Sequence, residues 1–244
     1  MNAGTILIGL LLLVVVAAIV IKLAKDKKKG KCAGCPYGCG GCLNQEKRIG
    51  SAYHASKNYY DKALAGKGFW AKIYMGFLWN VDDWAVRNKL FSSLTEDFSG
   101  RLLDVPTGTG LFTAEQYRTM KTAEIIALDY SEDMLEQARR RFSGIENVTC
   151  VQGDVGKLPY EDGAFDTVLS MNGFHVFPDK DAAFSETARV LKKGGTFLAT
   201  FYIKGERKIT DLMVNLVLSK RGWFTPPFWT KAELEEILRN TTAK

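Results

Sequence analysis

The chain has 244 residues, of which 46% are hydrophobic and 25% are charged, and its formal net charge is +6. This length is enough for one domain with a sizeable core plus an appendage. Residues 1–43 carry a net charge of +5, which leaves +1 for the rest of the chain. Because the basic charge is confined to the front, the composition argues against a nucleic-acid partner.

The first element in chain order is an uncharged aliphatic stretch, Thr5–Ile21. With residues 1–4 it is about long enough to cross a bilayer core, and a buried or surface helix is the alternative. Lysines follow it at positions 22, 25, 27, 28, 29 and 31. Because they come after the apolar run, they predict a stop-transfer signal rather than a cleaved signal peptide. The positive-inside rule then predicts a single-pass membrane protein whose remaining residues are cytoplasmic.

A cluster of cysteines comes next, at Cys32, Cys35, Cys39 and Cys42. Disulfides rarely persist in the cytoplasm, so the cluster favours metal binding or thiol chemistry. Four thiolates at this spacing can bind one Zn or Fe ion. A flexible reduced linker without a ligand is the alternative. We assign residues 1–31 to the membrane helix and stop-transfer segment, and residues 32–56 to the cysteine cluster and a linker.

Residues 1–43 resemble the small Cys-rich membrane proteins associated with the ferrous-iron transporter FeoB. The resemblance rests on the uncharged aliphatic stretch, the lysine-rich segment and the clustered Cys and Gly residues. It implies a metal-handling, iron-transport-associated accessory role as one alternative for the chain.

Residues 57–98 are rich in aromatic side chains, and Ile73, Phe77 and Val81 recur at helical spacing. We predict two or three helices here, which form a helical cap before a cofactor-binding core at residues 99–244. The aromatic rings either pack these helices on the sheet or line a substrate pocket.

From residue 101 apolar runs alternate with helical patterns. The predicted strands are Leu102–Val105, Ile125–Leu128, Val148–Gln152, Thr167–Ser170 and Phe197–Phe201. The predicted helices are Phe112–Met120, Ser131–Phe142 and Lys180–Leu191. Ser131 is the expected N-cap of the second helix, and Gly194 and Gly195 are expected to end the third. This rhythm predicts an α/β fold with a doubly wound, mostly parallel sheet covered on both faces.

The most informative stretch is residues 101–113, where an apolar strand ends in Asp104 and a glycine-rich turn follows. Gly108 and Gly110 lack a Cβ, so the turn can adopt positive φ angles and let a ligand approach its backbone. The free N–H groups of such a turn can face an anionic part of a ligand. Alone, this is a weak signal.

Polar residues also follow the next three strands. The two oxygens of Asp129 can accept both hydroxyl protons of a ribose. Asp154 can accept from an adenine amine while Val155 packs on the ring, and Asn172 and His175 follow the fourth strand. Any one of these acids, taken singly, is better explained as a helix N-cap or turn residue. Jointly they predict an adenosine site.

Two cofactor classes fit an adenosine site on this fold. A dinucleotide dehydrogenase needs a third glycine in its loop, whereas here Gly110 is followed by Leu111, Phe112 and Thr113. The chain is also too short for a large second substrate domain. Both points disfavour the dehydrogenase alternative.

Residues 103–110, 128–138, 153–166 and 188–195 resemble, in this order, the motifs of the class I S-adenosylmethionine-dependent methyltransferases. Within that superfamily the chain resembles the branch of quinone and small-molecule methyltransferases, over about residues 95–240. The resemblance implies a Rossmann-like methyltransferase fold with S-adenosyl-L-methionine as the cofactor. Pro106 departs from the pattern, because the family usually has Gly there and proline removes a donor.

The resemblance also implies cofactor-binding roles for Asp104, Thr107, Gly108, Gly110, Asp129, Tyr130, Met134, Asp154, Val155 and Asn172. Asp104 and the loop backbone would hold the methionine end, and Asp129 the ribose. Tyr130 and Met134 would lie beside the adenosine, and the Asp-Val pair after the third strand would hold the adenine. Asn172 would lie near the sulfonium.

Methyl transfer from a sulfonium mainly requires alignment of acceptor, methyl carbon and sulfur. A base is needed only when the acceptor must lose a proton, and His175 is the catalytic candidate at the rim of the fourth strand. A hydrogen-bonded structural histidine is the alternative.

Residues 203–229, called the lid segment below, are basic and apolar, which favours a hydrophobic, lipid-like acceptor reached from the bilayer surface. The sequence thus predicts a membrane-anchored methyltransferase with a small acceptor. The alternative is a metal-handling membrane protein whose cofactor-binding domain does not turn over.

Lys231–Arg239 resembles the last helix of the methyltransferase family, after which two further strands normally complete the sheet. The sequence ends at Lys244. We therefore expect a sheet that lacks the last two strands. Its fifth strand would be an exposed edge unless the lid segment, a second copy or another partner covers it.

Overall fold

The computed structural model describes residues 79, 81–220 and 222–242, which belong to one compact unit. The membrane helix expected at Thr5–Ile21, the cysteine cluster and most of the helical cap lie outside these residues. Within the described part, the helices are too short or too polar to cross a membrane. The same part contains no group of three or more His, Cys, Asp or Glu side chains able to hold a metal ion.

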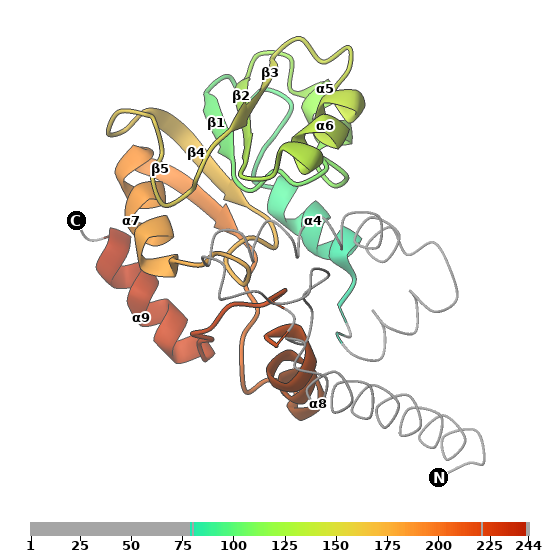
Figure 1. Cartoon of the computed structure of the whole chain (residues 1–244). Coiled ribbons are helices and arrows are strands. Elements are labelled where there is room, and N and C mark those ends of the chain that lie inside the picture. The colour runs from blue at the N-terminus through green and yellow to red at the C-terminus, as the bar shows by residue number, and fades with distance from the viewer. Residues whose placement is uncertain (1–78, 80, 221, 243–244) are drawn as a thin grey trace, which may run out of the picture. The chain divides into compact units, whose positions relative to one another are not determined.

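A five-stranded parallel sheet forms the centre of the described structure, with the strand order β3-β2-β1-β4-β5 (Figure 1). Its strands are β1 (Arg101–Asp104), β2 (Glu124–Asp129), β3 (Val148–Gln152), β4 (Phe165–Ser170) and β5 (Leu191–Ala199). The helices are α4 (Asp83–Phe91), α5 (Ala114–Thr119), α6 (Glu132–Arg141), α7 (Lys180–Val190), α8 (Lys208–Met213), the π-helix η2 (Val214–Leu218) and α9 (Lys231–Thr242). The prediction of a doubly wound parallel sheet is confirmed.

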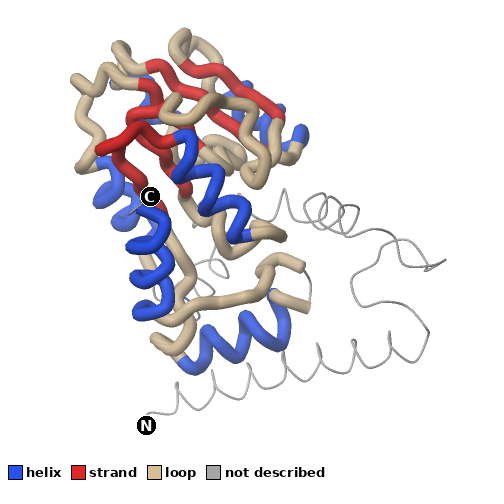
Figure 2. Tube along the Cα trace, turned by 90° about the vertical axis from the view of Figure 1, so that its left-hand side faces the viewer, coloured by secondary structure: helices blue, strands red, loops and turns tan. Residues whose placement is uncertain are grey.

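Strand alternation explains why both faces of the sheet are covered. In β2, Ile125 and Ala127 enter a core cluster shared with α5 and α6, whereas Ile126 and Leu128 enter a second cluster shared with α7 and α9. Successive side chains of a strand point to opposite faces, so an uninterrupted apolar strand needs helices on both sides. Figures 1 and 2 show α5 and α6 on one face and α7 and α9 on the other.

Local signals set most helix boundaries. The Ser131 hydroxyl accepts from the backbone N–H of Met134, which confirms Ser131 as the N-cap of α6. The expectation that the glycine pair ends α7 is wrong, because this helix ends at Val190. Leu191 is already extended and pairs with Phe165 of β4, so sheet pairing ends the helix. Gly194, with φ +78°, lies inside β5, where the register against β4 shifts.

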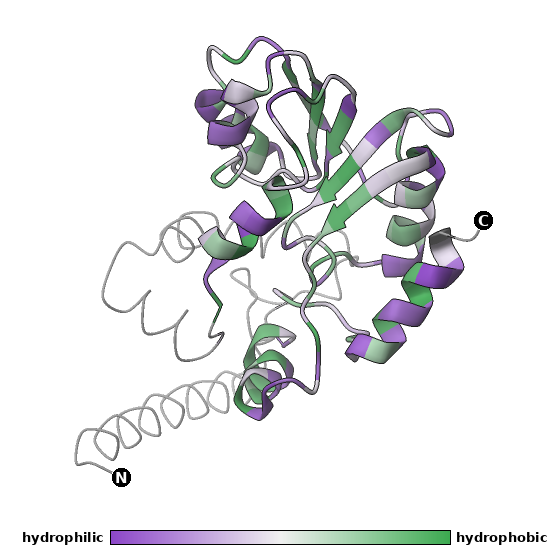
Figure 3. Cartoon of the chain, turned by 180° about the vertical axis from the view of Figure 1, so that it is seen from behind, coloured by the Kyte–Doolittle hydropathy of each residue, from purple (hydrophilic) through white to green (hydrophobic). Residues whose placement is uncertain are grey.

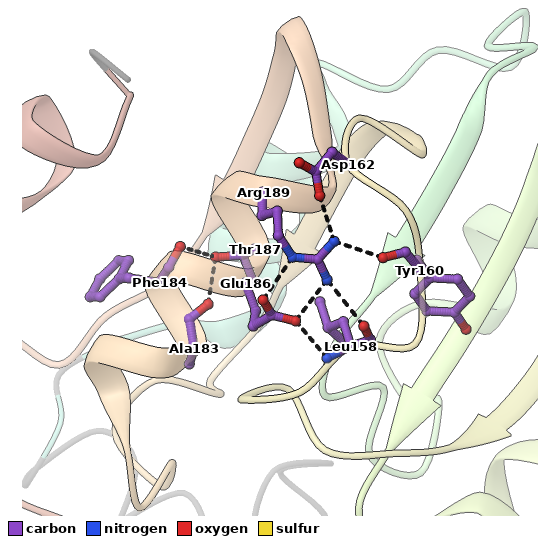
Figure 4. A network of polar contacts seen from close by, with 8 residues as sticks. All are labelled: Leu158, Tyr160, Asp162, Ala183, Phe184, Glu186, Thr187 and Arg189. Carbon is purple, nitrogen blue, oxygen red and sulfur yellow. Dashed lines mark hydrogen bonds and ion pairs between the residues drawn. The ribbon is translucent and has the colours of Figure 1, made fainter.

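Arg189 of α7 holds the connection between β3 and β4 in place (Figure 4). Its guanidinium donates to the backbone oxygens of Leu158 and Tyr160 and to the carboxylate of Asp162. Glu186 pairs with the same guanidinium and also accepts from the backbone N–H of Leu158 at 2.8 Å. The network fixes a loop that has no helix of its own.

The lid segment and α9 follow β5. Within residues 200–220 and 222–242 no further strand is present, and β5 pairs only with β4 in the described sheet. The lid segment has its own small core of Val214, Leu218 and Phe224. It returns to the sheet where Thr225 donates to the backbone oxygen of His175 at 2.8 Å.

Candidate functional site

The site lies where the direction of strand order changes. The chain runs outward from β1 to β3, then returns to place β4 on the other side of β1. Connections therefore diverge between β1 and β4, and ligands of open α/β sheets bind at this point beyond the carboxyl ends of the strands. The loops after β1, β2, β3 and β4 are the ones that can contribute residues.

The glycine-rich turn after β1 has the backbone geometry predicted for it. Gly108 and Gly110 have φ angles of +59° and +71°, a region that favours glycine. A Cβ on Gly110 would lie 2.7 Å from the ring of Phe142, whereas a Cβ on Gly108 would meet no atom within 4 Å. Gly110 is therefore needed for packing, and Gly108 leaves open space at the surface of the turn.

Asp129 joins this turn to the end of β2. It is 2% exposed, and its oxygens accept from the backbone N–H groups of Gly108 at 2.8 Å and Ser131 at 2.9 Å. Burial raises the pKa of Asp129 to about 6, and the backbone hydrogen bonds partly counteract the rise. The carboxylate is thus aligned by the turn, and a bound diol would share or replace these N–H donors.

Asp104 lies beneath the turn at the end of β1. It is 1% exposed and accepts from the Thr107 hydroxyl at 2.7 Å. Burial raises its pKa to about 7, and the Asp129 carboxylate adds to the rise. The buried Tyr117 hydroxyl is close enough to lower this pKa, yet no described residue partners it with good hydrogen-bond geometry.

Together these carboxyls are a buried acidic pair with no cationic partner among the described residues. Two carboxylates near each other in a buried site favour a positively charged ligand, since such a ligand stabilises their ionised forms. The open space over Gly108 and the acceptor pair of Asp129 also suit a sugar diol. The residues present therefore fit a cationic nucleoside such as S-adenosylmethionine.

The residues expected around the adenosine divide into two groups. Tyr130 is half exposed and Asp154 is exposed, and both lie near the ends of the neighbouring strands β2 and β3. Met134 is buried in the first turn of α6, and Val155 packs in the core cluster with Leu158. The structure thus leaves two of the four side chains accessible for contact with a base.

A partly buried polar network lies at the end of β4. Asn172 has φ +53°, its N–H donates to the Thr200 hydroxyl at 2.8 Å, and that hydroxyl donates to its side-chain oxygen at 3.1 Å. A hydrogen bond from Asn172 lowers the pKa of Asp83, although burial, the larger effect, raises it. One carboxylate oxygen of Asp83 is buried and has no hydrogen-bond partner in the part of the chain that the structure describes. Asp83 is therefore a further acceptor at the rim of the site.

Asp83 was missed in the sequence because it reads there as an ordinary helix-start residue of α4. Gly173 was missed too. A Cβ on it would lie 2.3 Å from Cδ of Pro106, so only glycine at this position lets the loop after β4 pack on that proline. A Pro in the turn together with Gly after β4 is the only local signal for this contact.

His175 is at the rim of β4, as predicted, but it is buried. Its ring stacks on Phe224 of the lid segment, with ring centroids 4.2 Å apart. Burial and the nearby Lys180 ammonium lower the pKa of His175 to about 3. In this conformation the imidazole is neutral and weakly basic, so its packing role is better supported by the geometry than proton transfer.

Comparison with known proteins finds similarity to methyltransferases over the part of the chain that forms the sheet. A methyltransferase domain family matches residues 102–195, and the family of FeoB-associated Cys-rich membrane proteins matches residues 4–46. An uncharacterised chloroplast methyltransferase of Arabidopsis thaliana is 34% identical over 150 residues, which are 57% of this chain and 42% of that protein. Demethylmenaquinone methyltransferase of Staphylococcus aureus strain MRSA252 is 41% identical over 96 residues, 39% of this chain and 40% of that enzyme.

The chain therefore spans less than half the length of these curated relatives. Among solved structures, a putative methyltransferase from Bacillus halodurans is 29% identical with a TM-score of 0.55, covering 64% of this chain and 67% of that one. A possible histamine N-methyltransferase from Thermotoga maritima, 20% identical with a TM-score of 0.56, covers 79% of this chain and 80% of that one. At this low identity the second similarity supports the fold alone.

Proposed function

We propose that the chain is a membrane-anchored, S-adenosylmethionine-dependent methyltransferase, from the premise that its residues 102–195 match a methyltransferase domain family. Its acceptor is a small, hydrophobic, lipid-like molecule. The observation that carries the proposal is the meeting of Asp104, Asp129 and the Gly108 turn at the switch point of the sheet.

When bound, the cofactor supplies an electrophilic methyl group. The chain's own residues bind and orient: the carboxylate of Asp129 accepts from hydroxyl groups, and Asp104 stabilises positive charge. Thr107 holds the Asp104 carboxylate in position through its hydroxyl. Alignment of the acceptor then supplies much of the rate.

The acceptor class rests on two supports. The matched Staphylococcus aureus relatives are named for demethylmenaquinone, a hydrophobic ring compound. Phe224 and Phe228 of the lid segment form an aromatic cluster with Tyr202, which directly precedes the segment and meets both rings edge-on. We propose a ring-containing acceptor of this chemical kind.

Where the acceptor loses a proton, two side chains are candidates to accept it. His175 is the residue predicted from the sequence, and Asp83 has a buried, unpartnered carboxylate oxygen near Asn172. Proton acceptance by Asp83 predicts that Asp83→Asn lowers turnover while S-adenosylmethionine binding stays within about threefold. If His175 is the base instead, His175→Gln should lower turnover in the same way.

The decisive test is direct binding of S-adenosylmethionine to the purified full chain, measured by calorimetry. Asp129→Ala removes an acceptor of charged hydrogen bonds, each worth about 1.5–3 kcal/mol, so affinity should fall by roughly 10- to 100-fold or more. Asp133→Ala, on the first turn of α6, is the matched control. Equal affinity in the wild type and the Asp129 variant contradicts the assignment.

A second candidate function is favoured by the match of residues 4–46 to FeoB-associated Cys-rich membrane proteins. In this alternative the cysteine cluster handles metal and the C-terminal domain binds its cofactor without turnover. It predicts Zn or Fe bound to the full chain in a stoichiometry that falls when Cys32, Cys35, Cys39 and Cys42 are replaced by Ser. Metal content that does not depend on these cysteines contradicts it.

A further inference from the structure

The helical part of the lid segment exposes an apolar strip. Ile209, Leu212 and Leu216 are 37%, 56% and 47% exposed, and they recur three and four residues apart along α8 and η2. The opposite side of the same helical stretch is buried, with Val214 at 0% and Leu218 at 3%. Figure 3 shows hydrophobic colouring along much of α8.

The strip belongs to a well-packed element, so its exposure does not result from loose structure. Val214 and Leu218 pack with Phe224 in the small core of the lid segment. Asp211 is the only acid in residues 207–220, and its carboxylate bonds to residues that precede α8. It accepts from the Tyr202 hydroxyl at 2.5 Å and from the Gly205 N–H at 3.0 Å.

Lysines flank the apolar strip at both ends. Lys208 and Lys220 are exposed, and the nearest exposed acid in the sequence, Glu206, precedes the helix. An apolar strip between lysines is typical of helices that lie in a membrane interface, because long lysine side chains reach the headgroups while their neighbours enter the acyl region. Anionic lipids add attraction for each lysine.

Two features of the chain favour a lipid surface over a protein partner. The sequence before the described residues holds the uncharged stretch Thr5–Ile21 and its lysine cluster, and residues 4–46 match a family of membrane proteins. A domain tethered in this way remains close to the bilayer. The exposed strip is also short, with three large apolar side chains, and suits shallow insertion better than a protein interface.

We propose that Ile209, Leu212 and Leu216 insert into the surface of an anionic bilayer, with Lys208 and Lys220 at the headgroups. The lid segment then faces the membrane and offers the site to an acceptor dissolved in the lipid. This inference rests on the proposed function for the acceptor, whereas the contact with lipid can be tested by itself.

The test uses the full chain in vesicles of phosphatidylcholine and phosphatidylglycerol, with a photoreactive residue in the strip. Leu212→p-benzoylphenylalanine and Leu216→p-benzoylphenylalanine are compared with Lys121→p-benzoylphenylalanine, at an exposed position between α5 and β2. After illumination and proteolysis, mass spectrometry should find lipid adducts on the two strip peptides at several times the control yield. Vesicles of phosphatidylcholine alone, or the pair Lys208→Gln and Lys220→Gln, should lower that yield.

Equal lipid adducts at all three positions, or none at either strip position, overturns the inference. Adducts to a second copy of the chain, seen as a covalent dimer, or to another part of the same chain overturn it as well. Binding of S-adenosylmethionine to the wild type tests the proposed function, and binding to each variant at the wild-type affinity shows that the variant is folded. Lipid adducts without cofactor binding would refute the proposed function and leave the membrane contact standing.

Discussion

Asp104 and Asp129 are the residues on which the chemistry of the site depends, because both are buried carboxyls with a raised pKa. The pKa is about 7 for Asp104 and about 6 for Asp129, and burial is the main cause for each. A raised pKa in the folded state means that both groups still hold protons where an unfolded carboxyl has lost them. A cationic ligand reverses this preference, since it stabilises the ionised form.

Cofactor affinity should therefore depend on pH. Below a pKa of about 7, S-adenosylmethionine must displace protons, so its affinity should rise by up to about tenfold per pH unit and level off above the pKa of Asp104. Calorimetry between about pH 5.5 and about pH 8.5, in buffers of different ionisation enthalpy, measures both the affinity and the protons released. S-adenosylhomocysteine, which lacks the sulfonium charge, is the control and should show a weaker dependence. An affinity that stays flat over this range contradicts the raised pKa values.

His175 allows a second prediction at the residue scale. Its pKa is lowered from 6.5 to about 3, so between these values the unfolded chain binds a proton that the folded chain refuses. The stability that His175 contributes is present above pH 6.5 and is lost as the pH falls toward 3. Relative to His175→Phe, the wild type should lose up to roughly 5 kcal/mol over this window.

Urea unfolding of residues 44–244 at several pH values measures the difference between the two proteins. Asp104 and Asp129 are present in both, so their opposite pH dependence cancels in the comparison. His175→Phe keeps a ring against Phe224, which the stacked geometry requires. A difference that does not change with pH would show that the imidazole is protonated freely and lies open to solvent.

At the scale of elements, the loop between β3 and β4 depends on α7. Arg189 donates to two backbone oxygens and pairs with Glu186 and Asp162. Arg189→Ala leaves Glu186 and these oxygens without the cation, and hydrogen bonds to charged groups are worth about 1.5–3 kcal/mol each. We expect a loss of about 2–4 kcal/mol in the free energy of unfolding.

Arg140→Ala is the matched control, because its pair with Glu136 lies on the exposed side of α6. Such surface pairs contribute about 0–1 kcal/mol. Chemical unfolding of both variants tests the comparison. Hydrogen exchange should also show faster exchange in residues 158–163 of the Arg189 variant, and similar losses in both variants would refute the special role of this network.

The elements themselves were largely predictable because their signals are local. Strand Val148–Gln152 agrees with the sequence pattern, and Ser131 identifies the start of α6. The end of α7 was not predictable, since pairing of Leu191 with Phe165 outweighs the nearby glycines. Long-range contacts of this kind have no signature in a single segment.

The same distinction holds for the site. Asp104 and Asp129 could be found because each directly ends an apolar strand, and the strand order then brings them together. Asp83 could not, since its relation to Asn172 depends on how α4 packs across the end of the sheet. The burial of His175 depends equally on Phe224, which returns to it from the lid segment.

At the scale of the whole molecule, two membrane contacts of different strength are proposed. The uncharged stretch Thr5–Ile21, taken with residues 1–4, is about long enough to span a bilayer, and this would make its insertion effectively irreversible. The lid strip of Ile209, Leu212 and Leu216 would insert only shallowly, and its lysines make its binding sensitive to salt. The two contacts can therefore be separated by how the protein is released.

The full chain should remain with membranes after washing in alkaline carbonate, because spanning helices resist extraction. Residues 44–244 should bind vesicles containing phosphatidylglycerol at low salt and be released as salt rises toward about 0.5 M, where the screening length is only a few ångströms. Leu212→Asp with Leu216→Asp should abolish that reversible binding, and Lys121→Gln should not. Sedimentation with vesicles measures all of these. Release of the full chain by carbonate would contradict the proposal of a membrane-spanning anchor. Binding of residues 44–244 that resists salt would show that something other than the lysine-flanked strip attaches this fragment to the vesicles.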